Sequence, residues 1–300
     1  MSNSSPMLEE GLPRGNEVIA MHEALRDGLS AVVIGRNEED FLPLTLPPLR
    51  AVADEIIFVD TGSEDRTIDI AEEHGCRIFR KPWQDDFSDA KNFGLDQARH
   101  SWILNVDCDE AVDGRPEVRR QLREKCLDDA EGKPVFIINI DNLMADGGVK
   151  QQDAMRLFRN DPRIRFEHPI HESVCDSVYR NWPEYKPEKI DVCLTHYGYR
   201  RDANKDKLKR NIAILRAWME REPDHIFGNY KLGMNLHYRG NVSEGLFFLG
   251  RAFELICRER DKASYPFLKT MIPFYVNGLI EDGRVAEARA VREKVLSWEE

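Results

Sequence analysis

The stretch Ser101-Trp-Ile-Leu-Asn-Val-Asp107-Cys-Asp109-Glu110 decides the fold, because an apolar run breaks off there into two carboxylates one residue apart. The run from Trp102 to Val106 has the length and composition of a buried strand. Side chains alternate between the two faces of a strand, so Asp107 and Asp109 share a face if the strand continues that far. Two like charges on one face need a counter-charge, which a divalent cation carrying phosphate oxygens would supply. An isolated Asp-x-Asp is more often a solvated strand end, so the rest of the chain has to decide.

The segments before this stretch alternate between strand and helix patterns. Short apolar runs predict strands over residues 30–34, 55–59, 77–80 and 102–106, and helices are predicted to begin at the N-caps Asn37, Ser63 and Ser88. This alternation predicts a parallel sheet covered by helices, in which ligands bind beyond the carboxyl ends of the strands. The polar breaks at Asn37, Asp60 and Asp107 each follow a strand, so we expect them to converge on one crevice.

The second half of the chain continues the sheet and then becomes helical. We predict a helix over 116–127 and strands over 135–140, 155–158 and 190–194, with helices from about residue 204 onward. The segments Gly240-Asn-Val-Ser-Glu-Gly245 and Gly283-Arg-Val-Ala-Glu-Ala288 share a layout at a spacing of 43 residues, which predicts a helix-hairpin repeat. The first unit resembles a tetratricopeptide repeat, whose packing positions are filled here by Leu232, Gly233, Leu236, Gly245, Leu249 and Ala252.

Composition excludes several classes of protein. The 300 residues are 41% hydrophobic and 32% charged, which suits a soluble chain that buries a core. The net charge of −11 argues against nucleic acid as the main partner. We find no apolar run that could span a bilayer and no secretory signal over residues 1–26, and the six cysteines lack Cys-x-x-Cys spacing. We therefore expect a cytoplasmic protein, either free or peripheral at the inner face of the membrane, with reduced thiols.

Four polar motifs occur in a fixed order along the chain, and together they are more specific than any one of them. The set resembles the family 2 glycosyltransferases with a GT-A fold, and among them bacterial glycocin-type peptide S-glycosyltransferase-like enzymes that carry tetratricopeptide repeats. The motifs are Asn37-Glu38-Glu39, Asp54-Glu-Ile-Ile-Phe-Val-Asp60-Thr-Gly-Ser63-Glu-Asp-Arg-Thr67, Trp83-Gln-Asp-Asp-Phe-Ser-Asp-Ala90-Lys-Asn92 and Trp102-Ile-Leu-Asn-Val-Asp107-Cys-Asp109-Glu110.

The resemblance covers residues 29–200 and implies an α/β fold. Its sheet is Rossmann-like, mostly parallel and flanked by helices, and an all-α tetratricopeptide-like region follows. We therefore divide the chain into three segments. Residues 1–28 are a partly flexible lead-in with one helix around 17–25, residues 29–203 are the GT-A domain, and residues 204–300 are the helical domain.

The resemblance also implies where the nucleotide sugar binds. Asp60 matches the carboxylate that accepts a ring N–H of the nucleotide base, and Asn37 and Glu38 match positions beside the nucleoside. Lys91 stands where the family more often has arginine, facing the phosphates. Lysine is a point charge without the bidentate fork of arginine, which is a departure from the family pattern.

The metal site follows from the same resemblance. Asp107 and Asp109 match the metal-binding Asp-x-Asp, which would hold Mn²⁺ or Mg²⁺ and place Asp107 beside the nucleotide sugar and Asp109 in catalysis. His196 resembles the late histidine that many GT-A enzymes add to the metal shell, although a hydrogen-bonded structural histidine is an equally good interpretation.

The best candidate region for the general base is the segment Phe166-Glu-His168-Pro-Ile-His171-Glu172. We predict Glu172 as the base that deprotonates the acceptor, with Asp153 and Glu167 as rivals. His171 could orient a substrate hydroxyl or the diphosphate. The alternative is a polar loop with hydrogen-bonded histidines.

These residues together predict a metal-dependent, inverting glycosyltransferase whose donor is a nucleotide sugar, with a UDP-sugar favoured. The acceptor stays open between a peptide, a glycan, a lipid-linked sugar and a small molecule. The helical repeat could bind the acceptor, a protein partner or a second copy of the chain. Two alternatives are an inactive GT-A protein that serves as a binding module and a nucleotidyltransferase, for which Gly35-Arg-Asn-Glu38 is a poor phosphate loop.

Overall fold

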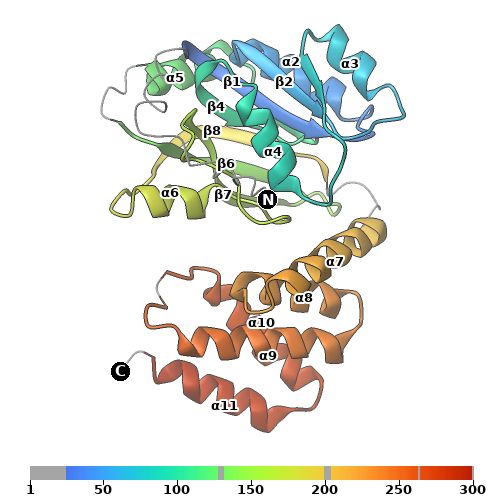
Figure 1. The fold of residues 1–300 in the computed structure, drawn as a ribbon, viewed down its shortest axis with the longest axis vertical. Coiled ribbons are helices and arrows are strands. Elements are labelled where there is room, and N and C mark those ends of the chain that lie inside the picture. The colour runs from blue at the N-terminus through green and yellow to red at the C-terminus, as the bar shows by residue number, and fades with distance from the viewer. Residues whose placement is uncertain (1–24, 128–131, 199–203, 263, 299–300) are drawn as a thin grey trace, which may run out of the picture. The chain divides into compact units, whose positions relative to one another are not determined.

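A computed structural model describes residues 25–127, 132–198, 204–262 and 264–298 of the chain. The chain divides into two compact units, Met1–Arg200 and Arg201–Glu300. The first unit is a sheet with flanking helices and the second is all helical (Figure 1), which confirms the predicted fold class. The lead-in helix predicted around 17–25 lies outside the described residues except for Leu25, and the two predicted boundaries, after residues 28 and 203, remain predictions.

The described strands of the first unit form one eight-stranded sheet in the order β3-β2-β1-β4-β7-β6-β8-β5. Neighbouring strands run parallel from β3 to β4, and β7 is antiparallel to both β4 and β6. The pair β6–β8 is parallel and β5–β8 is antiparallel, so the sheet is mixed at this end. The strands are β1 (Arg26–Gly35), β2 (Glu55–Asp60), β3 (Arg77–Arg80), β4 (His100–Asn105), β5 (Glu110–Val112), β6 (Val135–Leu143), β7 (Val149–Arg159) and β8 (Glu188–His196).

Helices cover both faces of this sheet, which is why its central strands are apolar on both sides. All six residues of β2 are buried, as expected of a strand covered twice. Helices α2 (Leu42–Val52), α3 (Thr67–Glu73) and α5 (Pro116–Leu127) contribute to the core of one face. Helices α4 (Phe87–Asp96) and α6 (Cys175–Asn181) contribute to the core of the other.

Three predicted helix starts are wrong, because the side chains expected to cap the helices bind other loops. The Asn37 side chain accepts from the backbone N–H of Glu64, the Ser63 hydroxyl accepts from the N–H of Asn37, and the Ser88 hydroxyl donates to the His168 carbonyl. These tertiary contacts replace local capping. The N-caps of α2, α3 and α4 are instead Phe41, Arg66 and Asp86.

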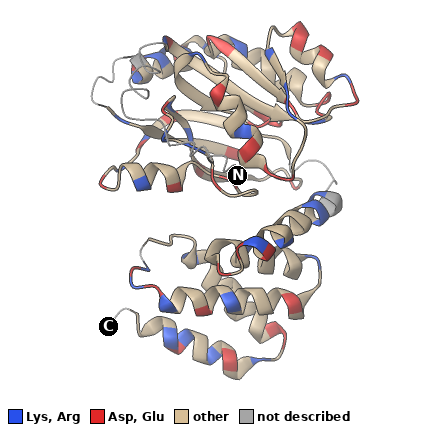
Figure 2. Ribbon diagram, in the orientation of Figure 1, with Lys and Arg blue, Asp and Glu red and all other residues tan. Residues whose placement is uncertain are grey.

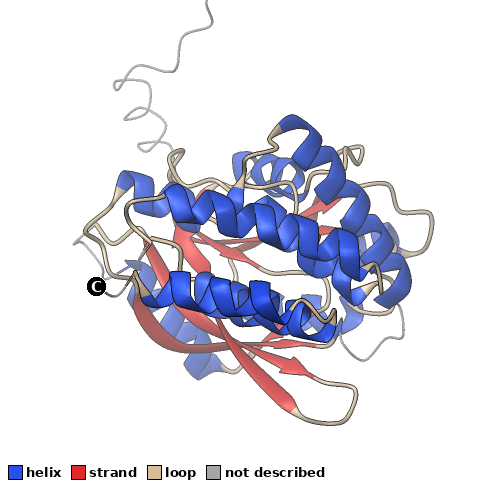
Figure 3. Ribbon diagram, turned by 90° about the horizontal axis from the view of Figure 1, so that it is seen from below, coloured by secondary structure: helices blue, strands red, loops and turns tan. Residues whose placement is uncertain are grey.

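The second unit consists of packed helices (Figure 3). Its two repeated segments are helix hairpins as predicted, α8 with α9 and α10 with α11. Gly240 and Gly283 adopt φ values of 88° and 79° at the turns, a region that favours glycine. A Cβ on Gly233 would lie 2.7 Å from the Gly245 carbonyl oxygen, so the first pair of helices is in close contact. The helices are α7 (Asn204–Arg221), α8 (Ile226–Tyr238), α9 (Val242–Arg258), α10 (Leu268–Glu281) and α11 (Val285–Leu296).

Charges of both signs follow one another along α9 and α11 (Figure 2), as in Glu287, Arg289, Arg292 and Glu293 of the last helix. This mixture is typical of helix surfaces in contact with solvent. Across the described part of the chain, every helix falls short of the length or the apolar character needed to cross a membrane.

Candidate active site

The loops that follow β1 and β2 are joined by hydrogen bonds at the carboxyl edge of the sheet. The backbone N–H of Asn37 donates to the Ser63 hydroxyl over 3.1 Å, and the Asn37 amide oxygen accepts from the N–H of Glu64 over 2.8 Å. The N–H of Glu38 donates to the Thr67 hydroxyl over 2.7 Å. Asn37 reaches these partners with a left-handed φ of 56°, a conformation that asparagine tolerates better than most residues. The two loops therefore form one connected edge.

Asp60 ends β2 within this edge and is 4% exposed. Its carboxylate accepts from the backbone N–H groups of Gly62, over 3.2 Å, and Ser63, over 3.0 Å. Gly62 has a φ of 114°, which closes the turn in a region that favours glycine. A carboxylate offers about four lone-pair positions, so these two bonds leave room for a further donor.

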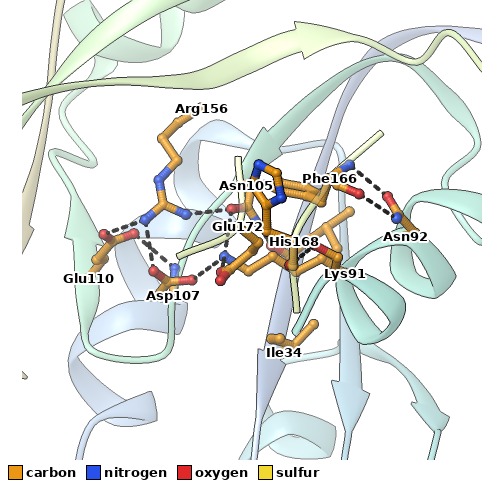
Figure 4. A network of polar contacts seen from close by, with 12 residues as sticks. Ile34, Lys91, Asn92, Asn105, Asp107, Glu110, Arg156, Phe166, His168 and Glu172 are labelled. Carbon is orange, nitrogen blue, oxygen red and sulfur yellow. Dashed lines mark hydrogen bonds and ion pairs between the residues drawn. The ribbon is translucent and has the colours of Figure 1, made fainter. Parts of the chain in front are cut away.

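The two aspartates of the Asp-x-Asp do not share a strand face, because β4 ends at Asn105. The N–H of Glu110 donates to the Asp107 carbonyl over 3.0 Å, which closes a turn between them. Asp107 points toward Lys91 and Arg156 (Figure 4), whereas Asp109 lies beside His196.

Lys91 is a buried cation among oxygen atoms. It lies on α4, is 2% exposed, and its ammonium is 2.7 Å from Glu172 Oε1, 3.0 Å from Asp107 Oδ1 and 3.3 Å from Asn105 Oδ1. The ammonium also lies 5.1 Å from the centre of the Phe166 ring. Burial lowers the pKa of Lys91, but the charges of Asp107 and Glu172 outweigh it and hold the pKa above its usual value. The side chain is therefore protonated at neutral pH.

Arg156 is a second buried cation, and sequence reasoning did not identify it. Its guanidinium donates to Asp107 Oδ2 over 2.7 Å, to Glu110 Oε1 over 3.0 Å and to the side chain of Asn105. The antiparallel pairing of β7 with β4 places it there. The available signal was an arginine inside the apolar run over 155–158, since a charge in a buried strand needs partners.

The two cations decide the charge state of Asp107. Burial raises the pKa of its carboxyl, but Arg156 and Lys91 outweigh burial and hold the pKa well below its usual range. For Glu110, which is 3% exposed, burial is the largest effect and the pKa is raised. The Glu110 carboxylate also accepts from the backbone N–H of Asp107 over 2.9 Å, so the Glu110 side chain is bonded to the turn that carries Asp107.

Asp109 and His196 meet because β5 pairs with β8, with Glu110 opposite His196. His196 Nε2 is 3.3 Å from Asp109 Oδ2, and His196 Nδ1 is 2.9 Å from the Asn142 amide oxygen. A histidine whose Nδ1–H donates to an amide oxygen presents Nε2 as a ligand. Carboxylate oxygen and imidazole nitrogen are donors that a divalent cation such as Mn²⁺ accepts.

These two residues would supply only part of a metal shell. Within the described residues, no three His, Cys, Asp or Glu side chains are grouped as a metal site. Both carboxylate oxygens of Asp107 are bonded to cations, so the structure brings Asp109 and His196 together and leaves Asp107 apart. Asp109 and His196 fit a cation whose remaining ligands are oxygens of a bound diphosphate.

The three candidate bases have different partners. Glu167 forms two 2.7 Å contacts with Arg180, and Asp153 lies 2.7 Å from Lys189. Glu172, in contrast, is bonded to Lys91, which also holds Asp107. Of the three, the structure therefore places Glu172 at the aspartate cluster.

Comparisons with known proteins find similar sequences among glycosyltransferases. The model of glycosyl transferase family 2 matches residues 30–152. A TPR repeat-containing protein of Synechococcus elongatus is 34% identical over 222 residues, which cover 71% of this chain and 53% of that protein. An uncharacterized glycosyltransferase of Rickettsia bellii is 37% identical over 160 residues, covering 53% and 48%. The SPbeta prophage-derived glycosyltransferase SunS of Bacillus subtilis is 25% identical over 249 residues, covering 81% and 53%. The chain spans about half the length of these curated relatives.

Proposed function

Because the chain belongs to the family 2 glycosyltransferases, we propose that it transfers a sugar from a nucleoside-diphosphate sugar to an acceptor. The observation that carries the proposal is the polar cluster at the end of β4. There Lys91 lies within hydrogen-bond distance of both Asp107 and Glu172. Lys91, Asp107 and Glu172 thus meet at the carboxyl edge of the sheet, where ligands of such sheets bind.

The donor is a UDP-sugar in this proposal. Uracil presents an N3–H donor, and Asp60 keeps acceptor positions beyond the two backbone bonds it already makes. Asn37 and Glu38 lie in the neighbouring loop, which is bonded to the loop after Asp60. Lys91 supplies positive charge for the diphosphate, as a point charge without a fixed fork.

The chemistry is a single displacement. A divalent cation, Mn²⁺ or Mg²⁺, held by Asp109 and His196 would neutralise charge on the departing diphosphate. Glu172 accepts the proton of the acceptor group, whose freed electron pair forms the bond to the anomeric carbon. The bond from that carbon to the diphosphate oxygen breaks, its electron pair stays on the oxygen, and UDP leaves. Attack from the face opposite the diphosphate inverts the configuration.

The acceptor is a nucleophile-bearing peptide, glycan, lipid-linked sugar or small molecule, and the helical unit is proposed to bind it or a protein partner. An inactive binding module is disfavoured, because the charged cluster of Lys91, Asp107 and Glu172 is formed. A nucleotidyltransferase is disfavoured because the loop after β1 carries Glu38 and Glu39 rather than a glycine-rich basic sequence.

The test is titration calorimetry of the full chain with UDP, with and without Mn²⁺. We expect UDP to bind wild-type protein more tightly with Mn²⁺, and Asp109→Asn to lose the metal-dependent gain while its melting temperature stays near that of wild type. If wild-type protein does not bind UDP in the presence of Mn²⁺, the proposed function is wrong.

A further inference from the structure

The hydrogen-bonding capacity of Lys91 is already used. An ammonium group has three N–H donors, and three oxygen atoms lie within 3.3 Å of this one. They belong to Asp107, Glu172 and Asn105 (Figure 4). An oxygen of an incoming diphosphate can therefore bind Lys91 only by displacing one of the three.

Two of these partners are hydrogen-bonded to a second cation, and within the described residues the third is not. Arg156 donates to both Asn105 and Asp107, so each keeps a charged donor when Lys91 turns away. Glu172 is 14% exposed, and within the described residues the polar partner of its carboxylate is Lys91. Arg156 acts on Glu172 through its charge without a direct bond, so Glu172 is the partner whose only direct bond among the described residues is to Lys91.

Glu172 also lies in the least regular of the segments that contact Lys91. Asn105 ends a strand, whereas Glu172 follows His171, which has a left-handed φ of 57°, and His168 nearby has a φ of 75°. Left-handed non-glycine residues are uncommon and cluster at active sites, ligand clamps and switch segments. If Lys91 exchanges one of its partners for the diphosphate, losing Glu172 therefore disturbs the strands and helices least.

We propose that the donor diphosphate and Glu172 compete for Lys91, so that donor binding releases the Glu172 carboxylate to accept the acceptor's proton. The proposal rests on the proposed function and adds an order of events to it. Before the donor binds, Lys91 holds the base in an ion pair. Once the diphosphate takes Lys91, the carboxylate is free to accept a proton. The chain thereby couples activation of the base to the presence of the donor.

The competition predicts that removing the charge of Glu172 strengthens nucleotide binding. We expect Glu172→Gln to bind UDP about five-fold or more tightly than wild type in calorimetry with Mn²⁺, within the usual range of coupling between sites. A purely structural role, or a direct contact between Glu172 and the donor, predicts unchanged or weaker binding. Glu167→Gln is the matched control, since it removes a charge from the same loop but its partner is Arg180. It should leave UDP affinity unchanged.

A double-mutant cycle separates competition for Lys91 from a general loss of negative charge. In a Lys91→Met background, Glu172→Gln should no longer tighten UDP binding, because the shared partner is gone. Tightening that persists there would overturn the proposal, as would equal UDP affinity of wild type and Glu172→Gln. Glu172→Ala repeats the measurement if the glutamine variant does not fold. Absence of UDP binding to the wild type overturns the proposed function as well, whereas equal affinities overturn this inference and leave the function standing.

Discussion

Arg156 is the residue on which the charge balance of the cluster depends. It is the cation bonded to Glu110, which is 3% exposed, and it also holds one oxygen of Asp107. Removing one member of a buried ion pair leaves the other charge without compensation. We expect Arg156→Met to lower the free energy of unfolding by about 3 kcal/mol, measured by urea denaturation followed by circular dichroism.

The control for this prediction is an ion pair at the surface, between an arginine and a glutamate at similar distances. Arg180 forms two 2.7 Å contacts with Glu167, and its side chain is 63% exposed. Arg180→Met should cost no more than about 1 kcal/mol, because solvent screens exposed pairs. Equal losses for the two variants would mean that the Arg156 cluster is solvated rather than buried.

At the scale of elements, Glu55 connects the amino ends of several strands on the edge of the sheet opposite the candidate site. Its carboxylate accepts from the Ser30 hydroxyl over 2.7 Å, the Arg99 backbone N–H over 2.7 Å and the Arg77 guanidinium over 2.6 Å. These partners precede or belong to β1, β3 and β4. Burial raises the pKa of Glu55, but the donors outweigh it and the net pKa lies below its usual value.

The lowered pKa gives a pH dependence with a definite sign. A carboxyl whose folded-state pKa is depressed contributes stability above its unfolded pKa, which is 4.5 for a glutamate, and loses it as the pH falls through the folded value. We expect wild-type stability to fall more steeply below about pH 4.5 than that of Glu55→Gln, which should cost about 2 kcal/mol at neutral pH. Urea denaturation between neutral pH and pH 3 measures both. Parallel pH profiles for the two proteins would contradict the prediction.

The bounds of a helix or strand could be predicted from the sequence where neighbouring residues alone determine them. The strand β3 and the helix α5 were predicted to the residue, because an apolar run or a proline marks their ends. The strand β5 was missed, since its three residues are too few to show alternation. Helix starts were misplaced because Asn37 and Ser63 form contacts between loops instead of capping.

In the candidate site, too, residues marked by a local sequence motif could be predicted, whereas contacts between distant segments could not. The order of motifs indicated Lys91 and Asp107, the segment 166–172 indicated Glu172, and the structure brings these three together. Arg156 was missed because its place depends on the register of β7 against β4, which joins residues far apart in the sequence. The separation of Asp107 from Asp109 was also not predictable, since it follows from the turn that ends β4 at Asn105.

At the scale of the whole molecule, the two units have separate hydrophobic cores. The two core clusters of the sheet consist of buried residues between Leu29 and Leu194, and the cluster of the helical unit runs from Tyr230 to Val291. A chain with separate cores need not unfold in one two-state step. A ligand that binds one unit raises the stability of the unit that holds it.

These separate cores predict that Leu249→Ala destabilises the helical unit and leaves the nucleotide site intact. Leu249 lies on α9 and is fully buried against Gly233 of α8, so its truncation should cost about 2–5 kcal/mol. In scanning calorimetry we expect one transition to move to lower temperature, while UDP affinity in titration calorimetry stays at the wild-type value. The matched variant Leu104→Ala, in the core of the sheet, should lower the other transition. UDP at 100 times its Kd should add about 2.7 kcal/mol to the free energy of unfolding of the sheet unit, and so move the transition of that unit to higher temperature. If Leu249→Ala abolishes UDP binding, or if UDP raises both transitions equally, the helical unit is part of the nucleotide site.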